Sequence, residues 1–451
     1  MNPLVFREYD IRGVADRDFD DALVRDIGRA FGTFCARRGK QRVALGRDCR
    51  LSSPRLHAAL LEGMLETGLH VHDIGVGPTP LLYFTVFESD LDGGVQITGS
   101  HNPGNENGFK LMCGKATLSG DEIRELRQLI VDGDFARRPG GQLEAYDPRP
   151  AYCGYMTGNI RLARKDLRFA VDSGNGAAGP LAIAAMQAVG LSPDAMYCEM
   201  DGHFPNHHPD PSEIHNLMPL IDRVRRDKLE IGIAFDGDGD RIGVIDERGE
   251  IIWGDRLMIL FSRQILKRHP GGAILGEVKC SQTLYDDIAK NGGRPIIWKT
   301  GHSLIKKKMK EESALLAGEM SGHMFFADRY FGYDDATYAA LRMLEIVAEA
   351  DAPLSTLLQD VPRTHATPEI RVDCADDVKF NVVQRVLDHY RREREVLDVD
   401  GARVRFEHGW GLVRASNTQP ALVLRFEAES PAQLDAIQSE VRGVVQKSMG
   451  G

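Results

Sequence analysis

The chain has 451 residues, which at roughly 150 residues per domain predicts several domains and excludes one small module. Apolar residues make up 42% and charged residues 27%, a composition typical of globular proteins and not of disordered or fibrous ones. Lysine and arginine number 56 against 66 aspartates and glutamates, so the formal charge of −10 disfavours a general binder of nucleic acid or anionic membranes. An anionic ligand would need a few local cations.

The cysteines and the N-terminus indicate the compartment. Seven cysteines are scattered without a Cys-x-x-Cys pair, which argues against a disulfide framework and favours a reducing environment. The first residues, MNPLVFREYDIRG, lack a basic stretch followed by an apolar one, so no secretory signal is expected. The longest uncharged run, residues 173–193, is expected to be a glycine-rich turn entering a helix and not a membrane span. We therefore expect a cytoplasmic protein, and a monomer, that binds neither nucleic acid nor membranes.

Three rounds of a first, a second and a third β-rich segment alternate with helical segments along the chain. The segments begin at Arg42, Val71 and Gly94, at Arg168, Ala195 and Ile231, and at Ala273, Pro295 and Leu315. The rounds recur at roughly 100 residues or more, much longer than a solenoid repeat. The pattern therefore predicts three related α/β domains, each with a largely parallel sheet.

From about Val361 the pattern changes to that of an α+β module with an antiparallel sheet. A hairpin is expected to turn at Asp400–Gly401, and residues 409–420 are expected to be irregular. The charged run at 306–312 is expected to be a solvated helix face. The predicted domains are residues 1–146, 147–248, 249–361 and 362–451.

Each predicted third strand runs into a polar loop that contains glycine: TGSHNP at 98–103, DGDGDR at 236–241 and GEMSGH at 318–323. Ligands of open α/β sheets bind beyond the carboxyl ends of the strands. The three loops are therefore expected to contribute to one site where the domains meet.

The loop DGDGDR places Asp236, Asp238 and Asp240 two residues apart after an apolar strand, and its glycines allow the carboxylates to converge. Converging carboxylates need a hard cation between them, which favours Mg²⁺ or Mn²⁺. A calcium EF-hand would use Glu247 as its twelfth residue, but a strand lies where that loop should continue. A polar hairpin turn is the remaining alternative.

The other loops are less specific. Ser100, flanked by Gly99 and His101, has a hydroxyl suited to phosphoryl chemistry, although such a sequence is also common in turns. GEMSGH suits a ligand rich in hydroxyl groups or a polar strand end. The C-terminal loop RASNTQP suits a phosphate or is a plain surface loop. Zinc bound by His203, His207, His208 and Asp210 is disfavoured, because prolines stiffen that loop.

Taken together and in this order, TGSHNP, DGDGDR, GEMSGH and RASNTQP resemble the α-D-phosphohexomutase family, and most closely its bacterial phosphomannomutase/phosphoglucomutase group. The resemblance extends from FREYDIRG at Phe6 to the C-terminal module. It implies three α/β/α domains with mixed sheets and a smaller C-terminal α+β domain around a central cleft. It also implies an isomerase that interconverts hexose 1-phosphate and hexose 6-phosphate, of mannose and of glucose, for sugar-nucleotide and surface-polysaccharide synthesis.

The resemblance also implies roles for individual residues. Ser100 would be a phosphoserine that passes its phosphoryl group to the sugar, and the 1,6-bisphosphate formed would reorient and return its other phosphoryl group. Mg²⁺ would be held by Ser100, Asp236, Asp238 and Asp240, with glucose 1,6-bisphosphate as activator. The catalytic residues would be Ser100, His101, Lys110, Arg241 and His323, and the substrate contacts would be Tyr9, Arg12, Lys279, His302, Glu319, Ser321, His323, Arg414, Ser416, Asn417 and Thr418. The general base would be His323 or Lys110.

Three alternatives remain from the sequence. A phosphoglucosamine mutase is disfavoured because Met320 stands where that group typically has glutamine. A metal-dependent sugar phosphatase would not need the second phosphate loop. A sugar-phosphate binding protein without catalysis would not need Ser100 together with the three aspartates.

Overall fold

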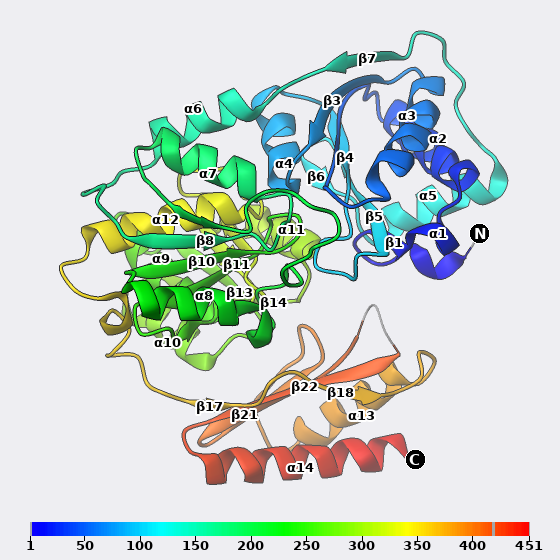
Figure 1. The fold of residues 1–451 in the computed structure, drawn as a ribbon. Coiled ribbons are helices and arrows are strands. Elements are labelled where there is room, and N and C mark those ends of the chain that lie inside the picture. The colour runs from blue at the N-terminus through cyan, green and yellow to red at the C-terminus, as the bar shows by residue number, and fades with distance from the viewer. Residues whose placement is uncertain (1, 417–419, 451) are drawn as a thin grey trace.

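The N-terminal domain is built on a mixed sheet of seven strands, in the order β1-β5-β4-β2-β3-β7 with β6 paired to β5 (Figure 1). The computed structural model describes residues 2–416 and 420–450. The strands are β1 Ile11–Val14, β2 Arg42–Arg47, β3 His70–Val76, β4 Gly93–Ile97, β5 Glu106–Cys113, β6 Ala116–Thr117 and β7 Gln142–Ala145. The helices are η1 Pro3–Val5, α1 Ala15–Asp18, α2 Asp21–Arg37, α3 Ser53–Glu66, α4 Thr79–Glu88 and α5 Asp121–Asp132.

The second and third domains follow with smaller sheets, ordered β12-β11-β10-β8-β9 and β14-β13-β15-β16. The second contains α6 Arg149–Asn159, β8 Phe169–Asp172, α7 Gly179–Ala188, β9 Asp194–Met196, α8 Ile214–Asp227, β10 Ile231–Phe235, β11 Ile242–Asp246 and β12 Ile251–Ile252. The third contains α9 Gly254–Leu266, β13 Ala273–Glu277, α10 Gln282–Lys290, β14 Arg294–Trp298, α11 His302–Glu312, β15 Leu316–Gly318, β16 Met324–Phe326, α12 Ala336–Glu349 and η2 Leu354–Thr356.

The three sheets share one topology. In each, the predicted first strand (β2, β8 or β13) runs parallel to the second (β3, β9 or β14) and to the third (β4, β10 or β15). The third strand then pairs antiparallel with its successor, β5, β11 or β16. The threefold recurrence is confirmed, and the sheets are mixed because each motif loop turns the chain back along its own strand.

The C-terminal domain has an antiparallel sheet ordered β17-β22-β21-β20-β19, with β18 paired to β22, and lies below the other domains in Figure 1. Its elements are β17 His365–Ala366, β18 Ile370–Asp373, α13 Lys379–Tyr390, β19 Val396–Leu397, β20 Ala402–Phe406, β21 Gly409–Ala415, β22 Ala421–Ala428 and α14 Pro431–Met449. The prediction of an irregular segment at 409–420 is wrong for its first half. Residues 409–415 form β21, in which Gly409 and Gly411 pack closely against β22 and Trp410 and Leu412 are buried.

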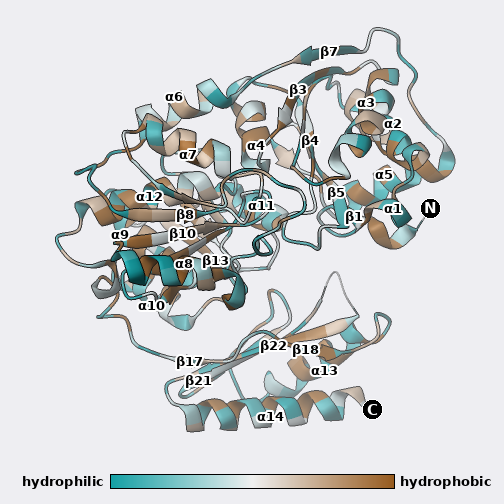
Figure 2. Ribbon diagram, viewed as in Figure 1, coloured by the Kyte–Doolittle hydropathy of each residue, from teal (hydrophilic) through white to brown (hydrophobic). Residues whose placement is uncertain are grey.

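The apolar core is divided unequally among the domains. One cluster joins the first three domains through buried side chains that include Phe84 of α4, Met186 of α7 and Tyr338 of α12. The fourth domain has a core of its own between its sheet and its two helices, and α14 accordingly alternates hydrophilic and hydrophobic colours in Figure 2. A small cluster of Val278, Trp410 and Leu412 adds an apolar contact with the third domain. The fourth domain is thus attached less extensively than the others are to one another.

Two further predictions concern charge and membranes. The prediction of a solvated face at 306–312 is wrong for Lys306, whose ammonium donates to the buried Asp334 at 3.1 Å and lies over the Tyr83 ring. Lys308, by contrast, makes an ordinary surface ion pair with Glu312. Within the described part of the chain, no helix combines the length and the apolar character needed to cross a bilayer.

Candidate active site

Ser100 lies in the loop that follows β4, and its hydroxyl contacts the second domain there. Its Oγ donates a hydrogen bond to Asp236 Oδ2 at 2.9 Å and lies 3.1 Å from His101 Nδ1. The residue is buried and its φ is +49°, a left-handed conformation that is uncommon outside glycine. The loops after the third strands of the first two domains therefore meet as predicted.

The three aspartates of the second loop converge, although residues 236–241 are also the hairpin turn between β10 and β11. Gly237 permits the approach, because a Cβ there would lie 2.4 Å from the Ser100 carbonyl oxygen. Asp236, Asp238 and Asp240 are fully buried, and each has an oxygen within 4.8 Å of the others. Among the described residues, Asp238 Oδ1 and Asp240 Oδ1 have no hydrogen-bond partner. Buried carboxylate oxygens in this arrangement fit a hard divalent cation.

Lys110 of β5 lies against these carboxylates. Its Nζ donates to Asp238 Oδ2 at 2.6 Å and also to Asp240 Oδ2. Burial opposes its charge, but the two aspartates raise the pKa of Lys110 well above its usual value. Burial also opposes the charge of Asp238, yet Lys110 lowers the pKa of this carboxyl. Lys110 is therefore held as a cation, which suits charge neutralisation better than acceptance of a proton.

The pKa of Asp236 is shifted in the opposite direction from that of Asp238. Burial, followed by repulsion from Asp240 and Asp238, raises the pKa of Asp236 well above the usual range. Arg241 and Lys110 act against this rise without cancelling it, and a divalent cation would supply further positive charge at the three carboxylates.

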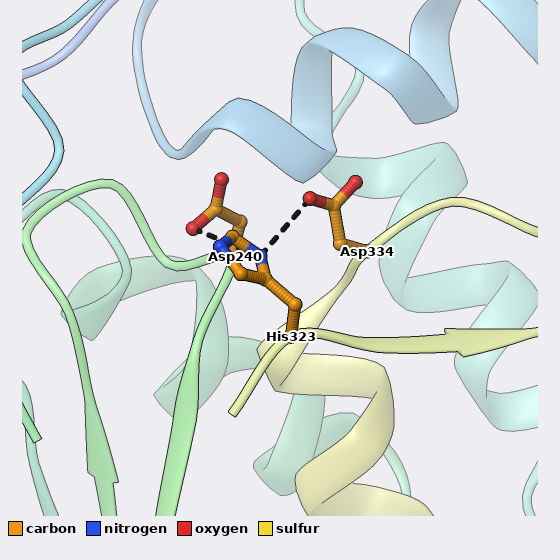
Figure 3. Close-up of side chains that lie close together, drawn as sticks. All are labelled: Asp240, His323 and Asp334. Atoms are coloured by element: carbon orange, nitrogen blue, oxygen red, sulfur yellow. Dashed lines mark ion pairs between the residues drawn. The ribbon is translucent and has the colours of Figure 1, made fainter. Parts of the chain in front are cut away.

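His323 of the third loop lies between two buried carboxylates (Figure 3). Its Nδ1 is 3.1 Å from Asp334 Oδ2 and 3.6 Å from Asp240 Oδ1. Its Nε2 lies 2.9 Å from Arg241 Nε, which donates to it. Because Nε2 accepts this hydrogen bond, the ring proton is assigned to Nδ1, facing the carboxylates. His323 thus offers Nε2 as an acceptor at the site.

Two other imidazoles are held neutral. Burial, with the nearby Arg241 and Arg12, lowers the pKa of His101 well below its usual value. Burial and the nearby Lys306 do the same for His302, whose ring stacks at 6.0 Å from that of His323. Neutral rings add donors and acceptors without increasing the positive charge.

The predicted sugar-binding residues link the third domain to the first. Glu319 is buried, and its Oε1 accepts from the Gly301 amide at 2.7 Å. Its Oε2 lies 3.4 Å from Ser321 Oγ, which donates to it. Tyr9 reaches across from the first domain, where its hydroxyl donates to the Thr300 carbonyl at 3.1 Å. Glu319 and Ser321 therefore lie beside the same loop that Tyr9 contacts.

Arg12, Lys279 and Arg414, which were predicted to contact the substrate, each form an ion pair with a carboxylate. Arg12 pairs with Asp10 at 2.7 Å and donates to Asn102 Oδ1 at 2.9 Å, inside the Ser100 loop. Lys279 lies 3.3 Å from Glu369 of the fourth domain. Arg414 is buried and its Nε donates to Asp400 at 2.9 Å. Through the pair of Lys279 with Glu369, the fourth domain reaches this site.

Ser416 is described, and its amide donates to the Ala421 carbonyl at 2.9 Å. Asn417 and Thr418 lie outside the described residues. The roles predicted for these residues in binding a phosphate stay predictions.

The disfavoured metal sites receive no support. His207 binds Asp172, His203 binds Asp201, and His208 contacts the His101 carbonyl, so these rings have separate partners. Glu247 binds Ser355. Within the described residues, the groups able to hold a metal are Asp236 with Asp238 and Asp240, and Asp240 with His323 and Asp334.

Sequence reasoning missed Asp334 and Arg50. Asp334 precedes Asp335, whose side chain accepts from the Tyr338 amide and so caps α12. A helix needs only one capping residue at its start, and Asp335 fills that role. The remaining carboxylate, Asp334, could therefore have been recognised from the sequence as a candidate site residue. Arg50 follows β2 and forms hydrogen bonds with the Ser100 loop, fifty residues later in the chain. No local pattern indicates this contact.

Comparison with known proteins agrees with the fold and the site. The domain families described as phosphoglucomutase/phosphomannomutase alpha/beta/alpha domains I, II and III match residues 3–137, 150–249 and 253–365, and the C-terminal domain family matches 369–444. The phosphomannomutase/phosphoglucomutase of Pseudomonas aeruginosa is 45% identical over 97% of this chain and 94% of its own. The chain therefore belongs to the phosphoglucomutase/phosphomannomutase family within the α-D-phosphohexomutase superfamily, and is a phosphohexomutase, an isomerase.

Solved structures have the same fold as this chain. A family protein from Burkholderia thailandensis has a TM-score of 0.94 and 41% identity, covering 100% of this chain and 99% of its own. A complex of Aspergillus fumigatus N-acetylphosphoglucosamine mutase with GlcNAc-6P and magnesium has a TM-score of 0.59 and 15% identity, covering 91% of this chain and 78% of that one. The latter likeness shows the shared fold alone.

Proposed function

We propose that the protein interconverts the 1- and 6-phosphates of mannose and of glucose through a phosphoryl group carried on Ser100. The observation that carries this proposal is the hydrogen bond from Ser100 Oγ to Asp236, 2.9 Å long, within a buried acidic group that Lys110 only partly neutralises. A hydroxyl at such a position can accept and donate a phosphoryl group. Phosphoryl transfer depends on positioning and charge compensation more than on covalent chemistry.

The metal we propose is Mg²⁺, held by Asp236, Asp238 and Asp240 with an oxygen on Ser100. The magnesium complex of the fungal mutase is consistent with this choice. When bound, the ion supplies positive charge against the oxygens of the transferring group. Lys110 contributes further positive charge at the same carboxylates. The Arg241 amide donates to Asp236, and Arg12 donates to Asn102 of the Ser100 loop.

We assign the proton from the attacking sugar hydroxyl to His323 Nε2. In the arrangement described, Arg241 donates to this nitrogen, so the guanidinium must turn aside for a sugar hydroxyl to take its place. Asp334 faces Nδ1 and compensates the positive ring that forms. Lys110 is the weaker candidate because its neighbours hold its proton.

The reaction requires the bisphosphate to bind in two orientations, so that each phosphate in turn faces Ser100. We assign the sugar hydroxyls to Glu319 and Ser321, together with His302 and Tyr9. The distal phosphate is assigned to Lys279, Arg414, Ser416, Asn417 and Thr418. The cations Lys279 and Arg414, paired with Glu369 and Asp400, support this assignment.

The test is a substrate panel. Purified protein with Mg²⁺ and a trace of glucose 1,6-bisphosphate should interconvert both glucose and mannose phosphates, and Ser100 should gain one phosphoryl group by intact mass. Activity confined to glucosamine phosphate would instead identify the sibling mutase. Release of inorganic phosphate faster than isomer formation would indicate a phosphatase. A protein that binds the sugar phosphates without acquiring phosphate at Ser100 would be a binding protein.

A further inference from the structure

The backbone of Ser100 needs support from outside its own loop. A φ of +49° is unfavourable for a residue with a Cβ, and it persists only where surrounding contacts fix it. The hydrogen bonds of the loop itself include those from the Ser100 amide to Thr98 Oγ1 at 2.8 Å and from the Asn102 amide to the Gly99 carbonyl at 2.9 Å.

Arg50 supports this loop through hydrogen bonds from its guanidinium to backbone carbonyls. Its NH2 donates to the carbonyls of Ser100 and Asn102, both at 2.7 Å. Its NH1 donates to the carbonyls of Pro103 at 2.6 Å and Glu106 at 2.9 Å. Its Nε donates to Asp48 Oδ2 at 3.2 Å. All five N–H groups of the guanidinium are thereby used, four of them on the backbone that carries Ser100.

Asp48 fixes the position of Arg50. Its Oδ1 accepts from the Arg50 amide at 3.0 Å and from Ser53 Oγ at 2.6 Å, and its Oδ2 also accepts from the Gly99 amide at 3.2 Å. The side chains of Asp48 and Arg50 are 2% and 0% exposed, so solvent cannot replace these bonds. The loop is fitted closely to the guanidinium, since a Cβ on Gly99 would lie 2.5 Å from Arg50 Cζ.

The second domain closes over the same assembly. The Phe204 ring lies 5.5 Å from Arg50 Cζ, and His208 contacts the carbonyl of His101. The guanidinium of Arg50 is fully engaged by Asp48 and by backbone carbonyls of the Ser100 loop and Glu106. Arg50 binds the backbone of the loop, whereas the Ser100 hydroxyl binds Asp236.

We infer that Arg50 is a positioning residue for phosphoryl transfer: its guanidinium holds the backbone of residues 100–106 so that the Ser100 hydroxyl stays aligned with the acidic group. This inference rests on the proposed function of Ser100. A lysine at this position would keep the charge but lose the planar fork, and so could not serve four carbonyls in this arrangement. A displacement of about 1 Å at a reacting group can cost roughly 100-fold in rate.

The test compares Arg50→Lys with Arg342→Lys. Arg342 of α12 is also fully buried, but it binds Asp328, which lies between β16 and α12, and Gln264 of α9, away from the Ser100 loop. Transfer from Ser100 to glucose 1-phosphate is measured in a single turnover, sugar-phosphate affinity by calorimetry, and folding by thermal melting. For Arg50→Lys we expect transfer about 100-fold slower, with the affinity changed less than about threefold. For Arg342→Lys we expect the wild-type rate, whatever the change in its melting temperature.

Gly99→Ala gives an independent test, because it removes no polar group and only pushes a methyl group toward the guanidinium. It should slow transfer without weakening sugar-phosphate binding, and it decides the matter if Arg50→Lys does not fold. A wild-type rate in whichever of these variants folds would overturn the inference. So would a loss of affinity as large as the loss of rate. If wild-type protein never acquires phosphate at Ser100, the proposed function fails, and the inference fails with it.

Discussion

Replacement of Asp334 by asparagine should reduce turnover without weakening substrate binding. The carboxylate lies 3.1 Å from His323 Nδ1 and is fully buried, so its effect on the substrate passes through the imidazole. An amide of the same shape can present its NH₂ group to Nδ1, which would favour the other tautomer and occupy Nε2 with a proton. His323 could then not accept a proton from the sugar at Nε2.

The magnitude follows from the lost interaction. The 3.1 Å ion pair of Asp334 with His323 should be worth about as much as a hydrogen bond to a charged group, about 1.5–3 kcal/mol. At 1.36 kcal/mol per factor of ten, kcat should fall roughly 10- to 150-fold. Asp334 also accepts from the Lys306 ammonium at 3.1 Å, so the variant should melt at a lower temperature as well.

The assay is the conversion of glucose 1-phosphate to glucose 6-phosphate, with kcat and KM determined separately. Asp335→Asn is the matched control, because Asp335 is equally buried but accepts from Tyr152 and Tyr330 instead of facing His323. It should retain the wild-type kcat. An Asp334→Asn variant with wild-type kcat, or with a loss no larger than that of Asp335→Asn, would refute the reasoning.

Three further predictions concern the metal, pH and helix capping. Mg²⁺ should raise the melting temperature of the wild type, whereas Asp238→Asn should lose both this shift and turnover; full activity of this variant at low Mg²⁺ would exclude Asp238 as a ligand. Burial raises the pKa of Asp335 to about 6, so the folded state binds a proton that the unfolded state releases at lower pH. Denaturant titrations should therefore show that the wild type loses about 2 kcal/mol between pH 4 and pH 6 relative to Asp335→Asn, and an unchanged difference would contradict this. Asp20→Ala should cost about 1 kcal/mol with no change in kcat, because Asp20 accepts from the Leu23 amide at the start of α2; a change in kcat would be unexpected.

The sequence predicted those parts of the fold that have a local cause. A strand such as β10, IGIAF, is apolar throughout because it is buried on both faces, and the Asp-Gly alternation after it signals a turn with converging carboxylates. Residues 409–415 were misjudged for the opposite reason. Three of them are glycine or alanine, residues that rarely indicate a strand, and they pair only because β20 and β22 flank them on both sides.

Which lysines are buried and paired with carboxylates was less predictable than the position of the loops. Lys110 and Lys306 have the same type of side chain as the exposed Lys307, yet Asp238 and Asp334 bind the first two in the interior. These partners lie 128 and 28 residues away along the chain, so no helical or strand spacing relates them. A buried lysine becomes recognisable only once tertiary contacts bring a carboxylate to it.

The formal charge of −10 can now be understood residue by residue. Arg12 is paired with Asp10, Lys279 with Glu369, and Arg414 with Asp400. Unpaired, such cations would be expensive to bury, and at the surface they would be screened. Part of the acidic excess therefore keeps these cations in place. Under the proposed function, an arriving phosphate would find positive groups that are already positioned. A net negative chain that binds an anionic sugar is then expected, because the local charges and not their sum determine what the site binds.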